Sequence, residues 1–214
     1  MAVAAPKVTK SRSREKPDVP GITRPMTYEE YMAGPEEMAR YDIIDGWKVY
    51  RLYGEKQLPN PTRQHQRIAL NLAEQFRAFE RREQQGETLV APCDVRITLR
   101  PLRSRQPDVL FISQARLAAN APADNPAPLS PAPELVVEIV SPSDKPSVLA
   151  AKIADYRAVD VQEVWVVRAE AQSVEVLRLS IDEIETVAEY GPGQTVASAV
   201  FSDLKVAVAD IFAV

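Results

Sequence analysis

The sequence predicts a protein of the α/β (α+β) class, with a mixed central β-sheet flanked by helices. Segments with helical periodicity alternate along the chain with short runs rich in valine, isoleucine and leucine. The run at residues 135–140 is apolar except for one charge, which is typical of a strand that is covered on both faces. A helical segment and another strand-like run follow it, and this order implies a right-handed parallel crossover. Hairpin patterns elsewhere make the sheet mixed.

Length and composition predict one folded domain. With 214 residues, 45% of them hydrophobic, the chain can bury a core as a single domain, which we place at residues 25–214. Residues 1–24 combine basic side chains with prolines and little hydrophobic pattern, so we expect a disordered arm there. Cys93 is the only cysteine, which excludes an internal disulfide and a multi-cysteine zinc site.

The N-terminal half of the domain carries three local signals. Thr27 and Glu30 form a capping-box pattern, so residues 27–39 should begin as a short helix that Gly34-Pro35 ends or bends. Asp45-Gly46 between two β-prone runs predicts a tight hairpin. Residues 62–84 then carry apolar side chains at helical spacing, which predicts an amphipathic helix.

The remaining elements follow from the same patterns. We expect strands at residues 88–91, 94–99, 108–112, 135–140 and 163–168, a helix at 145–158, and an antiparallel pair at 173–179 and 185–190. Residues 121–133 are rich in proline and alanine and predict a loop.

The charge distribution limits how the protein could bind a polyanion. The net charge is −4, although residues 1–105 carry 19 Lys and Arg against 14 Asp and Glu. Nucleic-acid binding would therefore need a local patch. Arg96, Arg100, Arg103 and Arg105 could form one, or they could be a solvated arginine-rich loop. No stretch has the length of a membrane span and the N-terminus lacks the apolar core of a secretion signal, so we expect a cytoplasmic protein.

Two carboxylates interrupt segments that should be buried strands. Asp108 starts the run Asp-Val-Leu-Phe-Ile, and Glu138 is the only charge in Leu-Val-Val-Glu-Ile-Val. Buried charges usually have a partner or a metal, because losing hydration costs several kcal/mol. The alternatives are a glutamate on the wet face of an edge strand and a strand-start aspartate that accepts backbone N–H bonds.

Lys152 is the third anomalous charge. In a helix that begins near Pro146, it shares one face with Val148, Leu149, Ile153 and Tyr156. It is thus the only charge on a stripe that should face the sheet. The ammonium could reach water beyond the helix edge, or it could join the two carboxylates and lower the cost of burying all three.

A series of short motifs carries a family resemblance. It comprises Tyr41-Asp42-Ile43-Ile44-Asp45-Gly46, His65-Gln66, Pro107-Asp108-Val109, residues 137–143 (Val-Glu-Ile-Val-Ser-Pro-Ser), Lys152, Tyr156 and Glu163-Val164-Trp165. In this order the chain, from about Thr27 to about Leu179, resembles the Uma-two family. That family is a bacterial group of restriction-endonuclease-like proteins within the PD-(D/E)xK nuclease superfamily.

The resemblance implies a restriction-endonuclease-like core and a metal-dependent DNA endonuclease. Asp108 and Glu138 would hold Mg²⁺, with Mn²⁺ as a substitute, helped by the main-chain carbonyl of Ile139. Lys152 would orient the attacking water or neutralise developing charge. DNA would be the substrate, and cutting both strands of a duplex with one site per chain would favour a homodimer.

The chain also departs from the superfamily pattern. Val140 stands two residues after the second acid, where a lysine is usual, and the resemblance implies that Lys152 replaces it from the following helix. Asp42 stands where the family usually has glutamate; it could act as a ligand through water or be an exposed strand residue. His65, the only histidine, could contact phosphate or transfer a proton, or it could face solvent.

Two functions from different classes therefore remain open. The first is the metal-dependent endonuclease. The second is a non-catalytic protein that keeps the nuclease fold for DNA binding or dimeric assembly.

Overall fold

The computed structural model describes residues 24–35, 37, 40–50, 61–119, 129–140 and 144–214. The predicted N-terminal arm lies outside this part of the chain apart from Arg24, and so does most of the predicted loop at residues 121–133. Within the described residues no helix has both the length and the apolar character needed to cross a membrane.

A six-stranded sheet forms the centre of the molecule. Its strand order is β10-β9-β8-β7-β6-β3, with bounds Ile184–Tyr190, Ser173–Leu179, Glu163–Arg168, Leu135–Val140, Val109–Ile112 and Glu87–Val90. β7 and β8 are parallel and the other neighbouring pairs are antiparallel. The predicted mixed sheet is therefore confirmed. Helix α4 (Pro146–Ala158) makes the crossover between the two parallel strands.

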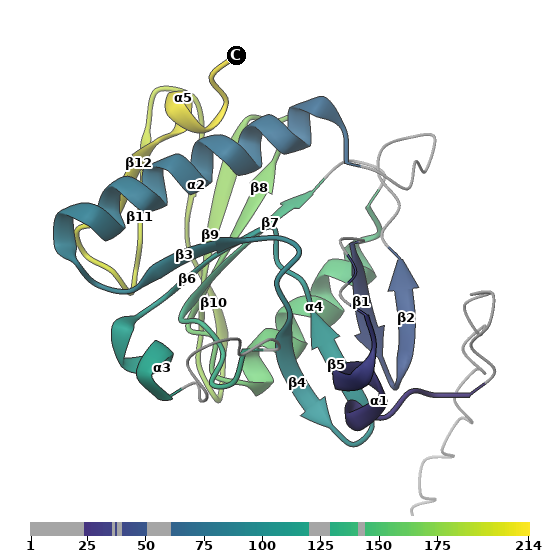
Figure 1. Cartoon of the computed structure of the whole chain (residues 1–214). Helices are drawn as coiled ribbons and strands as arrows, with labels where there is room; N and C mark the ends of the chain where they lie inside the picture. Colours follow the sequence, from purple (N-terminus) through teal and green to yellow (C-terminus); the bar gives the residue numbers. More distant parts are fainter. Residues whose placement is uncertain (1–23, 36, 38–39, 51–60, 120–128, 141–143) are drawn as a thin grey trace, which may run out of the picture.

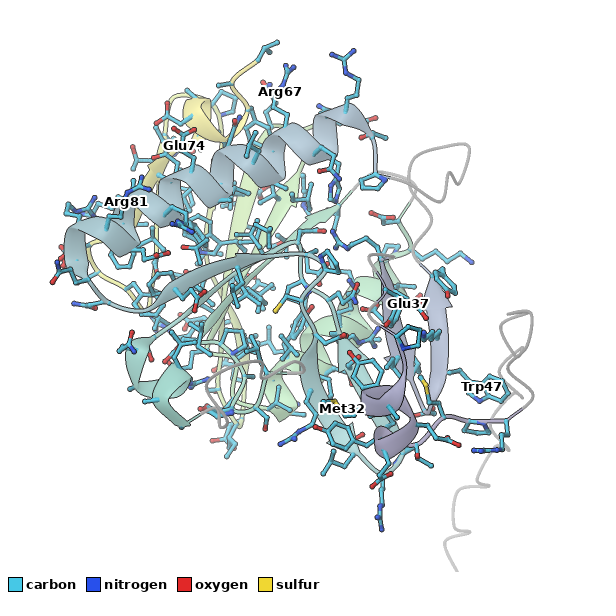
Figure 2. All side chains as sticks on the ribbon, in the orientation of Figure 1. Met32, Glu37, Trp47, Arg67, Glu74 and Arg81 are labelled. Carbon is cyan, nitrogen blue, oxygen red and sulfur yellow. The ribbon has the colours of Figure 1, made fainter. Side chains whose placement is uncertain are left out.

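One face of this sheet is covered by helix α2 (Arg63–Glu83). Its buried apolar side chains, Ile68, Leu72, Phe76 and Phe79, pack on side chains of β6, β7, β8 and β9. The short ribbon of β11 (Thr195–Ala197) and β12 (Lys205–Ala207), with helix α5 (Val208–Ile211), completes this layer beside α2 (Figure 1). Arg67, Glu74 and Arg81 recur every seven residues along the outer, exposed side of α2 (Figure 2).

Helix α4 packs against the opposite face through Ile153 and Tyr156. Val148, which was predicted to share this face, is instead half exposed in the first turn of the helix. The helix contacts the sheet from its second turn onward: Leu149 is partly buried, and Lys152, Ile153 and Tyr156 are buried.

A second sheet lies beside the first and has the order β2-β1-β5-β4. Its strands are β1 (Tyr41–Ile44), β2 (Trp47–Tyr50), β4 (Val95–Leu99) and β5 (Leu102–Arg105). The hairpin predicted at Asp45-Gly46 joins β1 to β2, and both turn residues have positive φ. A Cβ on Gly46 would come within 2.7 Å of Pro25 Cβ, so the turn needs glycine for space as well as for conformation.

Two helices complete the described elements. Helix α1 (Tyr28–Ala33) has the predicted capping box between Thr27 and Glu30 and ends at Gly34. Helix α3 (Gln114–Ala119), which was not predicted, follows β6. Strand β5 was also missed, because its arginines suggested a loop. It pairs with β1 on one side and β4 on the other, and its Leu102 and Ser104 side chains are buried.

Candidate active site

Asp108 and Glu138 are buried side by side on neighbouring strands. Val109 pairs with Val137 across the antiparallel β6–β7 ladder, so the residue before β6 faces the residue after Val137. Asp108 is 1% exposed and Glu138 is 2% exposed. The alternative of a glutamate on the wet face of an edge strand is wrong, because β7 lies inside the sheet between β6 and β8 and Glu138 is buried.

Lys152 and Tyr156 hold the Glu138 carboxylate. Lys152 Nζ lies 3.0 Å from Oε1 and 2.8 Å from Oε2, and the Tyr156 hydroxyl donates to Oε1 at 2.5 Å. The two donors are one turn apart on α4, so the spacing of the helix brings both to the same carboxylate. Lys152 is only 5% exposed, which excludes the alternative of an ammonium that reaches bulk water.

The Asp108 carboxylate joins the backbone of β7 to two basic side chains. Oδ2 accepts the Ile139 N–H at 2.7 Å, as expected of a strand-start aspartate that binds the backbone. Oδ1 accepts a hydrogen bond from Arg40 at 2.6 Å, and His65 Nε2 lies 3.3 Å from the same oxygen. His65, in the first turn of α2, is 8% exposed, so the alternative of a solvent-facing histidine is wrong.

Asp42 reaches the same region from β1 of the smaller sheet. Its Oδ2 lies 3.9 Å from Lys152 Nζ and accepts a hydrogen bond from Arg105 at 3.1 Å. Its Oδ1 accepts the backbone N–H of Gln106 at 3.0 Å. Asp42 is 5% exposed, so the alternative of an exposed strand aspartate is wrong. The structure therefore gathers the five predicted side chains in two groups of short contacts, His65 with Asp108 and Lys152 with Glu138 and Asp42, and the hydrogen bond from the Ile139 N–H to Asp108 joins the strands that carry them.

A salt-bridge cluster supports these contacts, and most of its members were not foreseen. Asp155 on α4 binds Arg105 Nε at 2.7 Å and Arg103 NH1 at 2.9 Å. Arg105 thus lies between Asp155 and Asp42, and it is 5% exposed. The patch of four arginines proposed for nucleic acid does not form as a surface, because two of the four point inward and bind carboxylates. The sequence offered one clue to this cluster: Asp155 comes three residues after Lys152, so the two side chains lie close together on α4.

A further carboxylate, Asp94, anchors α1 and β5 at the edge of the smaller sheet. Tyr31 and Ser104 both donate to it, the latter at 2.8 Å. Burial raises the pKa of Asp94 above its usual value, and these donors act in the opposite direction. Burial also raises the pKa of the neighbouring Cys93 thiol to about 12, so burial favours the neutral thiol there.

The donor chemistry of the site suits a hard divalent cation. Among the described residues there is no group of three or more His, Cys, Asp or Glu side chains that could hold a metal. Mg²⁺ commonly uses only one or two carboxylates and completes its shell with water and phosphate. Asp108 and Glu138, together with a main-chain carbonyl, match that smaller set.

A pocket of about 700 Å³ opens beside Asp108. It is bounded by the start of α2, by β3 and by the end of β2, and Arg40 and His65 line it next to the carboxylate. Asp108 and its two basic neighbours, Arg40 and His65, therefore lie at the wall of a pocket that a ligand can enter.

Comparisons with known proteins agree with this fold. A model of the Uma2 (Uma-two) family, described as "Putative restriction endonuclease", matches residues 28–209. A solved structure from Anabaena variabilis ATCC 29413, described as "a putative nuclease belonging to DUF820", is similar with a TM-score of 0.67 at 20% identity. The similarity covers 88% of this chain and 98% of that one, and at this identity it shows a shared fold. No curated protein matches the chain.

Proposed function

The chain belongs to the Uma2 family, as its motifs suggested, and on that premise we propose that it is a metal-dependent endonuclease that hydrolyses phosphodiester bonds in DNA. One observation supports this proposal above the others. Asp108 and Glu138 are buried at neighbouring positions of adjacent strands; α4 holds an ammonium against Glu138, and Asp108 lines an open pocket. Structural stability alone does not require such a group of buried charges.

We assign the metal to Asp108 and Glu138, with the carbonyl of Ile139 as a further oxygen ligand. The ion would be Mg²⁺, with Mn²⁺ able to replace it. When bound, such an ion polarises the phosphate and activates water. Asp42 lies nearby on the other sheet, and its shorter side chain suits a contact through water.

The basic residues supply the rest of the chemistry. Lys152, fixed between Glu138 and Asp42, would orient the attacking water or neutralise charge that develops on the phosphate. His65 lines the pocket, where its imidazole would contact phosphate or move a proton near neutral pH. Cutting both strands of a duplex would require two such sites, which favours a homodimer.

A second candidate is a non-catalytic protein that keeps the fold for DNA binding or dimeric assembly. It is favoured by one feature of the site: Asp108 is paired with Arg40 and Glu138 with Lys152. Ion pairs of this kind can fix a fold without any metal.

The experiment that separates the two candidates is a cleavage assay with purified protein, plasmid and oligonucleotide DNA, and Mg²⁺ or Mn²⁺. We expect metal-dependent cutting that falls by at least about a hundredfold in Asp108→Asn and in Lys152→Met, since each removes a group that acts on the reacting phosphate. Retention of the wild-type rate in both variants would exclude the assigned site.

Matched controls are available on the surface of the chain. Asp182 and Lys205 are exposed, so Asp182→Asn and Lys205→Met change the same charges away from the site. The melting temperature of every variant identifies loss of activity that comes from unfolding. DNA binding without cutting, unaffected by the site substitutions, would support the binding protein instead. Mass measurement in solution tests the proposed dimer.

A further inference from the structure

The lining of the pocket beside Asp108 combines charged and apolar side chains. Arg40 and His65 both contact Asp108, and these three side chains form what we call the charged end. Apart from Gln66, Arg77 and Thr88, the rest of the lining is apolar or aromatic, and it includes three large side chains exposed to solvent: Tyr50 is 43% exposed, Leu70 69% and Val90 49%. Solvent-exposed apolar side chains that gather at one cavity are typical of a binding surface.

Two buried polar atoms in the pocket wall lack hydrogen-bond partners within the described part of the chain. They are Arg40 Nε and Thr88 Oγ1. Thr88 is 6% exposed and lines the pocket, and its hydroxyl oxygen is buried in the pocket wall. Buried polar groups in folded proteins are almost always satisfied, which indicates that a ligand or water completes both. The pocket thus offers a cationic donor at its charged end and a hydroxyl on the β3 side.

This combination fits one nucleotide of a DNA strand. Sites for single-stranded nucleic acid combine basic groups that follow the backbone with aromatic or apolar surfaces against which bases stack. Here Arg40 and His65 would contact a phosphate, Tyr50 and Leu70 would contact a base, and Thr88 Oγ1 would bind its polar edge. A volume of about 700 Å³ lies in the range of small-molecule sites, about 300–1,000 Å³.

We propose that this pocket binds an unpaired nucleotide next to the bond that is cleaved. A base within a continuous duplex is stacked on both faces and paired at its edge, so it must leave the helix to enter a pocket. The inference rests on the proposed nuclease function and adds the form of its substrate: single-stranded or locally unpaired DNA. The phosphate at the Arg40 end would lie beside Asp108 and hence beside the proposed metal.

The test measures binding of fluorescent oligonucleotides in EDTA, so that no cutting occurs. The wild-type protein should bind a single strand at least about tenfold more tightly than the same sequence in a blunt duplex. Leu70→Glu should weaken binding of the single strand by about tenfold or more. Leu99→Glu is the matched control, because Leu99 is also an exposed leucine, lies outside the pocket lining and receives the same new charge. It should leave the preference unchanged.

Thr88→Val tests the polar contact separately, since it removes the hydroxyl and keeps the shape. It should weaken single-strand binding severalfold, by an amount that depends on the base. Equal binding by Leu70→Glu and wild type, or tighter binding of duplex than of single strand, would overturn the proposal. So would a change in molecular mass with Leu70→Glu and no change in DNA binding, which would assign the surface to a second copy of the chain.

These outcomes are independent of the proposed chemistry. Loss of the single-strand preference with metal-dependent cutting intact would reject the nucleotide pocket alone. Single-strand preference without any cutting would reject the catalytic assignment alone.

Discussion

Asp108 Oδ1 is the atom on which two basic side chains converge. Arg40 donates to it at 2.6 Å, and His65 Nε2 lies 3.3 Å away. Asp108 also lines the pocket where, in the proposed function, a divalent cation and a phosphate would meet. The positive charge of Arg40 beside this oxygen repels a cation that binds there, so Arg40 should weaken binding of the ion.

This repulsion gives a prediction for Arg40. Replacing it by glutamine removes the repelling charge, so Arg40→Gln should bind Mn²⁺ more tightly than wild type in the absence of DNA. A tenfold gain corresponds to about 1.4 kcal/mol. Isothermal titration calorimetry measures it directly, without any need for turnover.

Arg77→Gln is the matched control, because Arg77 also lines the pocket but pairs with Glu80, at 3.8 Å, and not with Asp108. Its Mn²⁺ affinity should equal that of wild type. If Arg40→Gln bound Mn²⁺ no more tightly than wild type, Arg40 would not weaken binding of the metal at Asp108.

At the scale of elements, Asp94 joins helix α1 to strands β4 and β5. Burial raises its pKa in the folded state, so the folded chain binds a proton there more tightly than the unfolded chain does. The stability contributed by this group is therefore complete below the unfolded pKa and is lost as the pH rises through the folded pKa.

Asp94→Asn removes this titration. The melting temperature of the variant minus that of wild type should increase as the pH rises from about 4 to 8, because only wild type loses stability through this group. Each tenfold difference in proton affinity between the folded and unfolded chains corresponds to about 1.4 kcal/mol, or about 3–6 °C in a protein of this size. Thermal unfolding at several pH values checks the sign, and a constant difference would contradict it.

Elements that rest on local signals were predictable. Thr27 and Glu30 make the predicted cap, Asp45-Gly46 makes the predicted turn, and the heptad-like stripe of α2 is buried as expected. Lys152 could also be predicted from helical spacing, because a charge on an apolar stripe can be recognised without knowing which residue it pairs with. The structure supplies that partner, Glu138.

Partners that come from distant segments were not predictable. Arg40 lies 68 residues before Asp108, and Arg105 lies 50 residues before Asp155. No spacing rule links such positions. Strand β5 was missed for the same reason: its arginines look like solvated loop residues until Asp42 and Asp155 are brought beside them.

At the scale of the whole molecule, Asp155 connects the two sheets. It binds Arg103 and Arg105 from β5 of the smaller sheet, while α4 packs on the larger one. Arg105 in turn holds Asp42. The position of Asp42 relative to Lys152 therefore depends on a contact between layers.

Asp155→Ala should leave two inward-pointing guanidinium groups without their shared carboxylate. Breaking a buried ion pair on one side costs about 3–5 kcal/mol, so the melting temperature should fall by about 6 °C or more. Asp182→Ala, an exposed aspartate, should change it by about 1 °C or less. A melting temperature for Asp155→Ala that equals that of the control would show that the sheets are held together without this link.

The lysine on α4 also bears on how related chains are recognised. Lys152 comes 14 residues after Glu138, yet its ammonium touches that carboxylate. A search for an acid followed two residues later by lysine would pass over this protein. In this chain the informative signal is a single charge on the apolar face of the following helix. The fold brings the ammonium to the carboxylate across 14 residues, so the contact is visible in space and hidden in the spacing of the sequence.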